Sequence, residues 1–417
     1  MNAPSAAQSE KCLMPAAMPI YLDNHATTRM DPRVLEAMKP YFCDVFGNPA
    51  SRSHPYGYKA QAAVEKARRT IAEAVGAALE SEVVFLSGAT EANNLALRGV
   101  MAAARHSGKN HLITTPVEHK SVLETCSALK AEGVRVTFLS IRRDGSLNLD
   151  ELRRCIGPET ALISVMHANN EIGTIYPLSQ IGEIAHAAGV LFHTDAVQTF
   201  GKLPINVQEM GIHLLSVSAH KLYGPKGTGA LYVRRLNPRV AIRPIVTGGA
   251  QEGGLRAGTL AVPLIVGFGA AVELALAEMQ SEQGRLARLR DELLRGLAVK
   301  CPGMTINGTM TARLPNNLNV NFPGINHASL MFVLKARLAV SHGSACAGNS
   351  ARGSYVLEAL GLEPELCRGA IRFGLGRFTT AAEIAESIQI VSEAAARVSD
   401  PAFQHPSDAE LKASGCC

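Results

Sequence analysis

The stretch SAHKLYGPKG at residues 218–227 contains Lys221 and follows a mostly apolar run at residues 212–217. An apolar run of this length, followed by glycine and proline, predicts a buried strand. The glycines beyond Lys221 let a ligand approach the backbone closely. The sequence therefore places a lysine amine beside a ligand-binding surface at the end of a strand.

A second apolar run, at residues 190–193, leads to Asp195. Enzymes that use pyridoxal 5'-phosphate (PLP) need this pair of groups, because a lysine forms a Schiff base with the aldehyde and a carboxylate pairs with the pyridinium nitrogen. Lys221 and Asp195 are thus candidates for binding PLP. The alternative is that a lysine and an aspartate end two strands by chance, and the other motifs decide between these interpretations.

The composition is typical of a soluble globular enzyme, with 417 residues, 47% hydrophobic and 18% charged. This length exceeds that of most single cores, so we expect two domains. The net charge of +5, without a basic block, does not indicate nucleic-acid binding. We find no apolar stretch of the ~20 residues that a membrane span needs, and residues 1–18 resemble neither a secretory signal nor a transit peptide. We expect a cytoplasmic protein.

The cysteines form an odd and scattered set without CxxC spacing. This argues against a disulfide framework and against a structural zinc site. We expect most of them, including Cys126 and Cys155, to be small buried residues. The nine positions are 12, 43, 126, 155, 301, 346, 367, 416 and 417.

Short apolar runs alternate with amphipathic segments between about residues 83 and 233. This alternation predicts an α/β fold with a doubly wound, mostly parallel seven-stranded sheet that helices cover on both faces. Ligands bind such sheets at the carboxyl ends of strands, where Lys221 and Asp195 lie. The expected strands are 83–86, 112–114, 134–139, 161–165, 190–193, 214–217 and 230–233, and the expected helices are 92–105, 121–131 and 179–187.

The pattern changes near residue 267. A long helical stretch at 268–300 has apolar residues three and four positions apart. We expect it to link a large PLP-binding domain at 21–276 to a smaller α+β domain at 277–400. The other expected segments are an N-terminal arm (1–20), strands near 318–322 and 370–374, a last helix (381–398) and a C-terminal tail (401–417).

The segment SGATEAN at residues 87–93 follows an expected strand and opens a helix. Small residues and a hydroxyl at a helix N-terminus bind anions well, because free backbone N–H groups and the helix dipole converge there. The segment is therefore a candidate for binding the phosphate of PLP. The alternative is an ordinary helix cap made by Ser87 or Thr90.

Four more polar residues are candidates for the same site. His119 follows a strand and is placed to stack on the cofactor ring, although a lone histidine is more often structural. Asn170 also follows a strand and is a candidate donor to the ring oxygen or to a substrate carboxylate. Gln198, three residues beyond Asp195, is placed to reach the ring hydroxyl. The guanidinium of Arg372 suits an α-carboxylate, and the alternative is a surface salt bridge.

Residues 341–350 read SHGSACAGNS and surround a single thiol, Cys346. Such small residues cannot pack much of a core, so we expect this segment to be mobile. Buried structural cysteines instead lie in apolar periodic segments. A thiol flanked by glycines in an exposed loop favours a functional role for Cys346.

In their order and spacing, these motifs resemble cysteine desulfurases of the PLP-dependent aminotransferase class V group. The resemblance is to the bacterial type that supplies sulfur for iron–sulfur clusters, and it spans about residues 21–398. Each motif is weak by itself, whereas the ordered set is specific. The matching segments are YLDNHATT (21–28), 87–94, EHK (118–120), HANNEIG (167–173), DAVQ (195–198), 218–227, 248–259, SAC (344–346) and 371–380.

The resemblance implies the aminotransferase fold type I and assigns roles to the candidates. Lys221 would hold PLP as a Schiff base, and Asp195 would pair with the ring nitrogen. His119 would stack on the ring and take part in proton transfer, and Gln198 would bind the ring oxygen. The phosphate would be held by Ala89, Thr90, Ser218 and His220.

The resemblance also implies how substrate and subunits are arranged. Asn170, which would contact the cofactor as well, and Arg372 would bind the carboxylate of L-cysteine. Thr259 would reach the phosphate in the partner subunit, which implies a homodimer with shared sites.

The implied reaction transfers the sulfur of cysteine to the Cys346 thiolate, leaving L-alanine and an enzyme persulfide. The persulfide would pass to an acceptor protein such as an iron–sulfur scaffold, where Cys346 would be a transient ligand of a [2Fe–2S] cluster. The sequence does not name the acceptor. A cluster scaffold, a tRNA-thiolation enzyme, a nitrogenase assembly factor and a DNA-sulfur system are all open.

Two other functions are alternatives. An aminotransferase or a selenocysteine lyase of the same fold would not depend on Cys346. A catalytically idle scaffold is the other alternative, and intact Lys221, Asp195 and His119 argue against it. His342, Ala250 and the terminal Cys416–Cys417 pair depart from the usual pattern, and they leave the chemistry intact but the choice of partner open.

Overall fold

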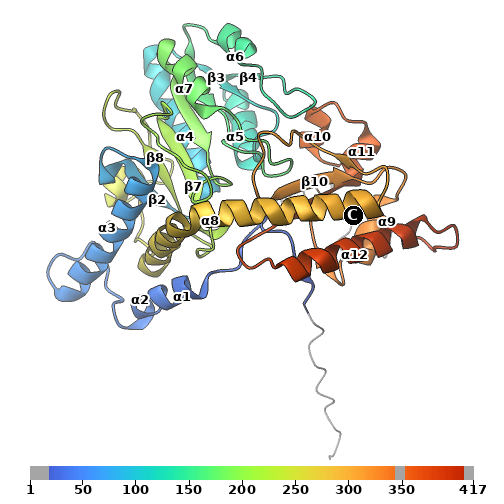
Figure 1. Cartoon of the computed structure of the whole chain (residues 1–417). Coiled ribbons are helices and arrows are strands. Elements are labelled where there is room, and N and C mark those ends of the chain that lie inside the picture. The colour runs from blue at the N-terminus through green and yellow to red at the C-terminus, as the bar shows by residue number, and fades with distance from the viewer. Residues whose placement is uncertain (1–17, 343–352, 408–417) are drawn as a thin grey trace, which may run out of the picture.

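The computed structural model describes residues 18–342 and 353–407 (Figure 1). A large sheet with its covering helices occupies one part of the molecule, and a smaller sheet with α12 occupies the other. The long helix α8 (Val262–Lys300) runs between them. Cys346 and the terminal pair Cys416–Cys417 lie outside the described residues.

Seven strands form the central sheet in the order β2-β8-β7-β6-β5-β3-β4. Only β8 runs antiparallel to its neighbours in this sheet. The α/β fold with a mostly parallel seven-stranded sheet is therefore confirmed. The strands are β2 (Val83–Leu86), β3 (His111–Thr114), β4 (Arg135–Phe138), β5 (Thr160–Ser164), β6 (Leu191–Asp195), β7 (Leu214–Ser218) and β8 (Gly229–Val233).

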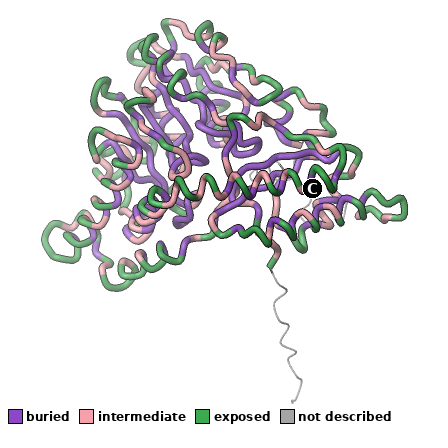
Figure 2. Tube along the Cα trace, in the orientation of Figure 1, coloured by how far each residue is buried: buried purple, intermediate pink, exposed green. Residues whose placement is uncertain are grey.

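Helices cover both faces of this sheet because successive side chains of a strand point to opposite faces. On one face, Val84 and Leu86 of β2 belong to a core that includes residues of α4 and α5. Phe85 belongs to the core on the other face, with residues of α3, α7 and the first half of α8. Figure 2 shows buried residues along the strands and exposed residues at the outer turns. These helices are α3 (Pro55–Val75), α4 (Ala89–Ala104), α5 (Lys120–Ala131) and α7 (Leu178–Ala187).

Helix α8 begins at Val262, earlier than the predicted start at residue 268. Pro263 lies in its first turn, where proline suits a helix because its fixed φ is helical and no N–H is needed. The first half of α8 packs on α1 and α3, and its second half packs on α12. The predicted division into domains 21–276 and 277–400 falls inside this helix and stays a prediction.

The apolar first half of α8 also corrects one expectation from the sequence. An 18-residue window of this helix has a mean hydropathy of 1.7, enough by length and composition to cross a membrane. The expectation that no such stretch exists is therefore wrong. Phe268, Ala271 and Val272 are buried in the core of the molecule, so packing inside the protein accounts for their apolar character.

A second core lies beneath the smaller sheet, in which β10 (Asn317–Asn321) pairs with β12 (Ala370–Gly374) and β9 (Thr305–Ile306). The leucines of the second half of α8 pack here with α12 (Ala381–Ser399). Leu22 belongs to the same core, because β1 (Ile20–Tyr21) pairs with β11 (Leu338–Ala339). The N-terminal segment thus connects the second core to the large sheet.

The remaining helices are short. They are α1 (Pro32–Met38), α2 (Pro40–Cys43), α6 (Leu149–Cys155), α9 (His327–Leu334), α10 (Tyr355–Ala359) and α11 (Pro364–Gly369).

Most of the described cysteines are buried, as expected. Cys126 is buried, whereas Cys155 is half-buried and Cys43 is exposed.

Two glycines of α8 provide a test of this packing. A Cβ on Gly269 would lie 2.9 Å from Ala67 Cβ and 3.0 Å from Ala67 Cα of α3, whereas a Cβ on Gly284 would meet nothing within 4 Å. We expect Gly284→Ala to raise the free energy of unfolding by about 0.5–1 kcal/mol. We expect Gly269→Ala to lower it, because overpacking costs about 1–3 kcal/mol.

Urea unfolding of the two variants and the wild type measures both effects. Equal stabilisation by the two substitutions would contradict the close contact between α8 and α3.

Candidate active site

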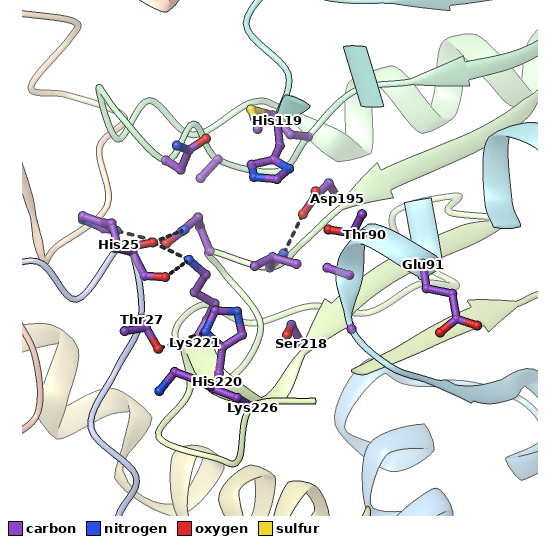
Figure 3. A pocket seen from close by; sticks show the side chains of 18 of the residues that line it. His25, Thr27, Thr90, Glu91, His119, Asp195, Ser218, His220, Lys221 and Lys226 are labelled. Atoms are coloured by element: carbon purple, nitrogen blue, oxygen red, sulfur yellow. Dashed lines mark hydrogen bonds between the residues drawn. The ribbon is translucent and has the colours of Figure 1, made fainter. Parts of the chain in front are cut away.

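A pocket of ≈ 470 Å³ opens at the carboxyl ends of the sheet strands (Figure 3). It brings together ten of the residues that the sequence singled out. Thr259 and Cys346 are the two that do not line it, since Thr259 is exposed and Cys346 lies outside the described residues. The ten are Ala89, Thr90, His119, Asn170, Asp195, Gln198, Ser218, His220, Lys221 and Arg372.

Lys221 is held in this pocket by the N-terminal segment. It ends a short 3-10 turn, Ala219–Lys221, that follows β7. Its Nζ donates to the carbonyls of His25 at 2.5 Å and Ala26 at 2.6 Å. The backbone N–H of Thr28 donates to the His220 carbonyl at 3.0 Å. Segments almost 200 residues apart in the sequence therefore position the lysine together.

Asp195 ends β6, and two N–H donors fix its carboxylate. Asn93 Nδ2 donates to Oδ2 at 2.8 Å, and the backbone N–H of Val197 donates to Oδ1 at 3.0 Å. The side chain is almost completely buried. A carboxylate in such a place is oriented before a ligand arrives, which suits a partner for a ring nitrogen.

A chain of hydrogen bonds joins Asp195 to His119. Asn93 Nδ2 also donates to Ser121 Oγ at 2.8 Å, and Ser121 Oγ lies 2.8 Å from His119 Nδ1. The backbone N–H of Ser121 donates to the same Nδ1 at 3.2 Å. Nδ1 is thus an acceptor, and the neutral ring carries its proton on Nε2. His119 lies across the pocket from Lys221 (Figure 3).

Sequence reasoning assigned no role to Asn93 or Ser121. Asn93 does lie in the segment 87–94 that carried the family resemblance, so a signal was present. What the sequence does not contain is the partner, because Asn93 and Asp195 are 102 positions apart.

The segment 87–93, which the sequence predicts to bind the phosphate and which we call the anion cradle, lies at the N-terminus of α4, opposite Ser218 and His220. Gly88 has φ +156°, and a Cβ there would meet nothing within 4 Å, so the backbone borders open space. Burial, with Lys221 next, lowers the pKa of His220 to about 4, and its Nδ1 lies 3.1 Å from Thr27 Oγ1. The neutral ring therefore leaves the positive charge on this side of the pocket to Lys221 and Lys226.

Glu91 is the one acidic residue of the predicted cradle. Its carboxylate accepts from the backbone N–H of Ser87 at 2.7 Å and pairs with Arg256 at 2.9 Å. Arg256 therefore neutralises a charge that would otherwise repel an anion at the helix terminus.

At the other end of the pocket, Arg372 lies on β12 and is 1% exposed. Nη1 donates to the Asn170 carbonyl at 3.0 Å, and Nη2 pairs with Asp23 at 2.7 Å. The alternative of a surface salt bridge is therefore wrong, because the ion pair is buried. Nε of Arg372 has no hydrogen-bond partner among the described residues.

Gln198 and His25 form a further pair in the pocket wall. Gln198 Oε1 lies 3.0 Å from His25 Nδ1, and Nε2 donates to the His25 carbonyl at 3.1 Å. Burial, with Arg372 and Lys202 next, holds the pKa of His25 well below its usual range. His25 belongs to the segment 21–28 that carries the family resemblance, although the sequence alone indicates no role for it.

The pocket fits PLP by its unused polar atoms and its charges. Within the described part of the chain, His25 Nε2, Asn170 Oδ1 and Arg372 Nε are buried without a hydrogen-bond partner. Buried polar atoms rarely stay unpaired, so three in one pocket indicate a polar ligand. A lysine amine, an oriented carboxylate and a helix N-terminus then match an aldehyde, a ring nitrogen and a phosphate.

The chain on either side of Cys346 is fixed at this pocket. Ser341 and Arg372 exchange backbone hydrogen bonds at 2.7 and 3.3 Å. Beyond the undescribed residues, Ser354 Oγ donates to Glu171 Oε2 at 2.5 Å, next to Asn170. Both flanks of the Cys346 segment therefore attach to residues beside the pocket. In the described ranges, no group of three or more His, Cys, Asp or Glu residues could hold a metal.

Glu118 precedes the pocket residue His119, and its burial predicts a pH-dependent stability that can be measured. It is buried, and burial raises its pKa from 4.5 to about 8, although Met166 N–H and Thr115 Oγ donate to it. The fold thus favours the protonated acid, and this contribution is lost as the pH rises towards 8. We expect Glu118→Gln to raise the melting temperature at pH 8.5 more than at pH 5.5.

The exposed Glu386→Gln serves as the control, for which we expect the same small change at both pH values. If the difference in melting temperature between wild type and Glu118→Gln were the same at both pH values, the buried Glu118 would not be protonated in the folded protein.

Comparisons with known proteins agree with this geometry. Residues 20–386 match the aminotransferase class-V family. A relative named cysteine desulfurase IscS, from Anaeromyxobacter sp. (strain Fw109-5), is 50% identical over 376 residues, which are 90% of this chain and 92% of that protein. A protein of the same name from Rickettsia bellii (strain OSU 85-389) is 49% identical over 374 residues, 90% of each chain.

Solved structures give the same answer. One named NifS-like protein has a TM-score of 0.83 and 38% identity, and the match covers 90% of this chain and 99% of that chain. Another, named SspA in complex with cysteine, has a TM-score of 0.74 and 39% identity over 86% of this chain and 99% of that one. The pocket, the sheet and these similarities lead to one conclusion: the chain belongs to the aminotransferase class-V family, whose enzymes use PLP.

Proposed function

We propose that this protein is a cysteine desulfurase that uses PLP and collects the sulfur of L-cysteine as a persulfide on Cys346. The observation that carries the proposal is the attachment of both flanks of the Cys346 segment beside the Lys221 pocket. Ser341 is bonded to Arg372, and Ser354 is bonded to Glu171. A chain of five residues spans at most about 18 Å, which sets how far Cys346 can be from Ser341. The names of the relatives support the same activity.

PLP, when bound, supplies an electron sink for the amino acid. Asp195, oriented by Asn93 and Val197, would face the ring nitrogen. Lys221 Nζ would hold the cofactor and then accept the α-proton of cysteine. The Nε2 proton of His119 would face the bound ring and substrate, as its Nδ1 is used by Ser121.

The carboxylate of cysteine would lie between Arg372 and Asn170, where it would accept from Arg372 Nε, which has no partner among the described residues, and from the Asn170 amide Nδ2. The Cys346 thiolate would attack the substrate sulfur, forming an S–S bond while the C–S bond of cysteine breaks. L-Cysteine and the Cys346 thiol thereby become L-alanine and a Cys346 persulfide. Atoms and electrons balance without an external oxidant.

Substitution of the two reactive residues tests this function. With L-cysteine and a thiol reductant, we expect wild type to release equal amounts of alanine and sulfide. Cys346→Ala should bind PLP and become yellow but form no persulfide, because the acceptor sulfur is absent. Lys221→Ala should lose at least a hundredfold in turnover, since a general base contributes about 10²–10⁴.

The control is Cys155→Ala, which removes a half-buried thiol at the end of α6, outside the pocket, and should leave activity unchanged. Full sulfide release by Cys346→Ala would eliminate the desulfurase proposal in favour of a selenocysteine lyase or another β-elimination. Alanine formed from pyruvate in its place would favour an aminotransferase. A protein that stays colourless with PLP would favour an idle scaffold.

We also propose that the enzyme is a homodimer with shared sites and acts in the cytoplasm. Thr259 is exposed and does not line the pocket of its own chain. Both properties are expected of a residue that contacts the cofactor in the partner subunit. Exposed aromatic side chains of α2 and its surroundings, including Phe42, Phe46 and Tyr56, provide apolar surface for a second copy. An acceptor such as an iron–sulfur scaffold would take the persulfide.

Dimerisation and the role of Thr259 can be measured separately. We expect sedimentation equilibrium to give twice the chain mass at micromolar concentration. Thr259→Val should lower the affinity for PLP by about tenfold or more, because a hydrogen bond to a charged group is worth about 1.5–3 kcal/mol. The exposed Thr311→Val is the matched control. A monomeric holoenzyme, or an unchanged affinity in Thr259→Val, would contradict the shared site.

A further inference from the structure

Strand β10 carries three asparagines at alternate positions, Asn317, Asn319 and Asn321, and each is at most 1% exposed. Alternate residues of a strand face the same side. Burying an amide costs free energy unless its polar atoms find partners. The hydrogen bonds of the three asparagines therefore indicate why this buried face carries amides. The contacts divide the asparagines into two that bond to the carbonyl of Glu171, next to the pocket residue Asn170, and one that does not.

Asn319 and Arg372 hold consecutive carbonyls of one loop. They are directly opposite each other in the antiparallel pairing of β10 with β12. Asn319 Nδ2 donates to the carbonyl of Glu171 at 3.1 Å, and Arg372 Nη1 donates to the carbonyl of Asn170 at 3.0 Å. Two side chains from neighbouring strands of the smaller sheet therefore hold the backbone of the loop that contains Asn170 and Glu171.

Three further hydrogen bonds hold Glu171 in this loop. Asn317 Nδ2 also donates to the Glu171 carbonyl at 3.1 Å, and the Glu171 N–H donates to Asn169 Oδ1 at 2.8 Å. The Glu171 carboxylate accepts from Ser354 Oγ. Glu171 is thus bonded through its N–H, its carbonyl and its carboxylate, and it fixes the backbone directly beside Asn170.

Asn321 has the same chemistry without the contact to the loop. Asn307 joins the two residues, since its Nδ2 donates to Asn319 Oδ1 at 2.8 Å and its Oδ1 accepts from Asn321 Nδ2 at 2.9 Å. Loss of either amide would therefore leave one polar atom of Asn307 unpaired. Only loss of the Asn319 amide would also remove one of the two side-chain donors that hold the Glu171 carbonyl.

We infer that Asn319 is a positioning residue for amino-acid binding. Through the Glu171 carbonyl it keeps Asn170 in register with Arg372, so that the Asn170 amide Nδ2 and the unused Arg372 Nε can both donate to the α-carboxylate of the substrate. This inference rests on the proposed function for the identity of the substrate. It requires only that the ligand is an α-amino acid bound by Asn170 and Arg372.

The experiment compares Asn319→Leu with its matched control Asn321→Leu in the PLP-loaded enzyme. We expect Asn319→Leu to raise the KM for L-cysteine about tenfold and to change kcat by less than threefold. The dissociation constant of L-alanine, measured by the change in cofactor absorbance without turnover, should rise by the same factor. Asn321→Leu should leave both constants within twofold of wild type.

Thermal unfolding separates this role from a loss of stability. Both leucine variants should lose stability, because each leaves one atom of Asn307 unpaired, and Asn319→Leu should lose somewhat more because it also gives up the bond to the Glu171 carbonyl. Asn319→Leu with wild-type KM and alanine affinity would overturn the inference, as would equal effects of the two variants on binding. Should Asn319→Leu fail to fold, Asn319→Ala and Asn321→Ala make the same comparison without added volume.

The two proposals fail in different ways. Absence of persulfide and alanine with wild-type enzyme would reject the desulfurase but leave the comparison of alanine affinities decisive for Asn319. Desulfurase activity with unchanged affinities in Asn319→Leu would reject the positioning role alone.

Discussion

The buried positive charge of Arg372 connects most parts of this molecule. A charge that is 1% exposed is costly unless it is paired and hydrogen-bonded. Asp23 supplies the opposite charge and the Asn170 carbonyl a further acceptor. Because Asp23 comes from the N-terminal segment and Asn170 from the loop after β5, one guanidinium joins three distant parts of the chain. Ser341, at the start of the Cys346 segment, is bonded to the same residue through the backbone.

The opposite side of the pocket is organised by neutral groups. Asn93 donates to both Asp195 and Ser121, and Ser121 in turn bonds to His119. The orientation of the acid and the tautomer of the histidine are therefore set by the same amide. Across the pocket from His119, the amine of Lys221 donates to two backbone carbonyls at 2.5 and 2.6 Å. A ligand that brings a phosphate and an aldehyde complements such a site.

The sequence predicted the seven strands closely because apolar runs of three to six residues with glycine, proline and polar boundaries carry a strong local signal. It also predicted ten pocket residues, since residues that follow parallel strands meet at one edge. It misjudged α8, whose apolar start was assigned to no helix and whose hydropathy went unnoticed. It gave no role to Asn93, His25, Glu171 or Asn319, because their function lies in hydrogen bonds to residues distant in the chain.

By itself, then, the sequence determined the fold class, the placement of Lys221 and Asp195 at the ends of two strands and the presence of one thiol in a segment of small residues. Local patterns suffice for these features because strand periodicity and the chemistry of a side chain do not depend on remote contacts. Only the tertiary structure decided that Arg372 is buried on Asp23 and that Asn319 faces the carbonyl beside Asn170. Such contacts depend on how two sheets pack together, and no short stretch of sequence specifies that geometry.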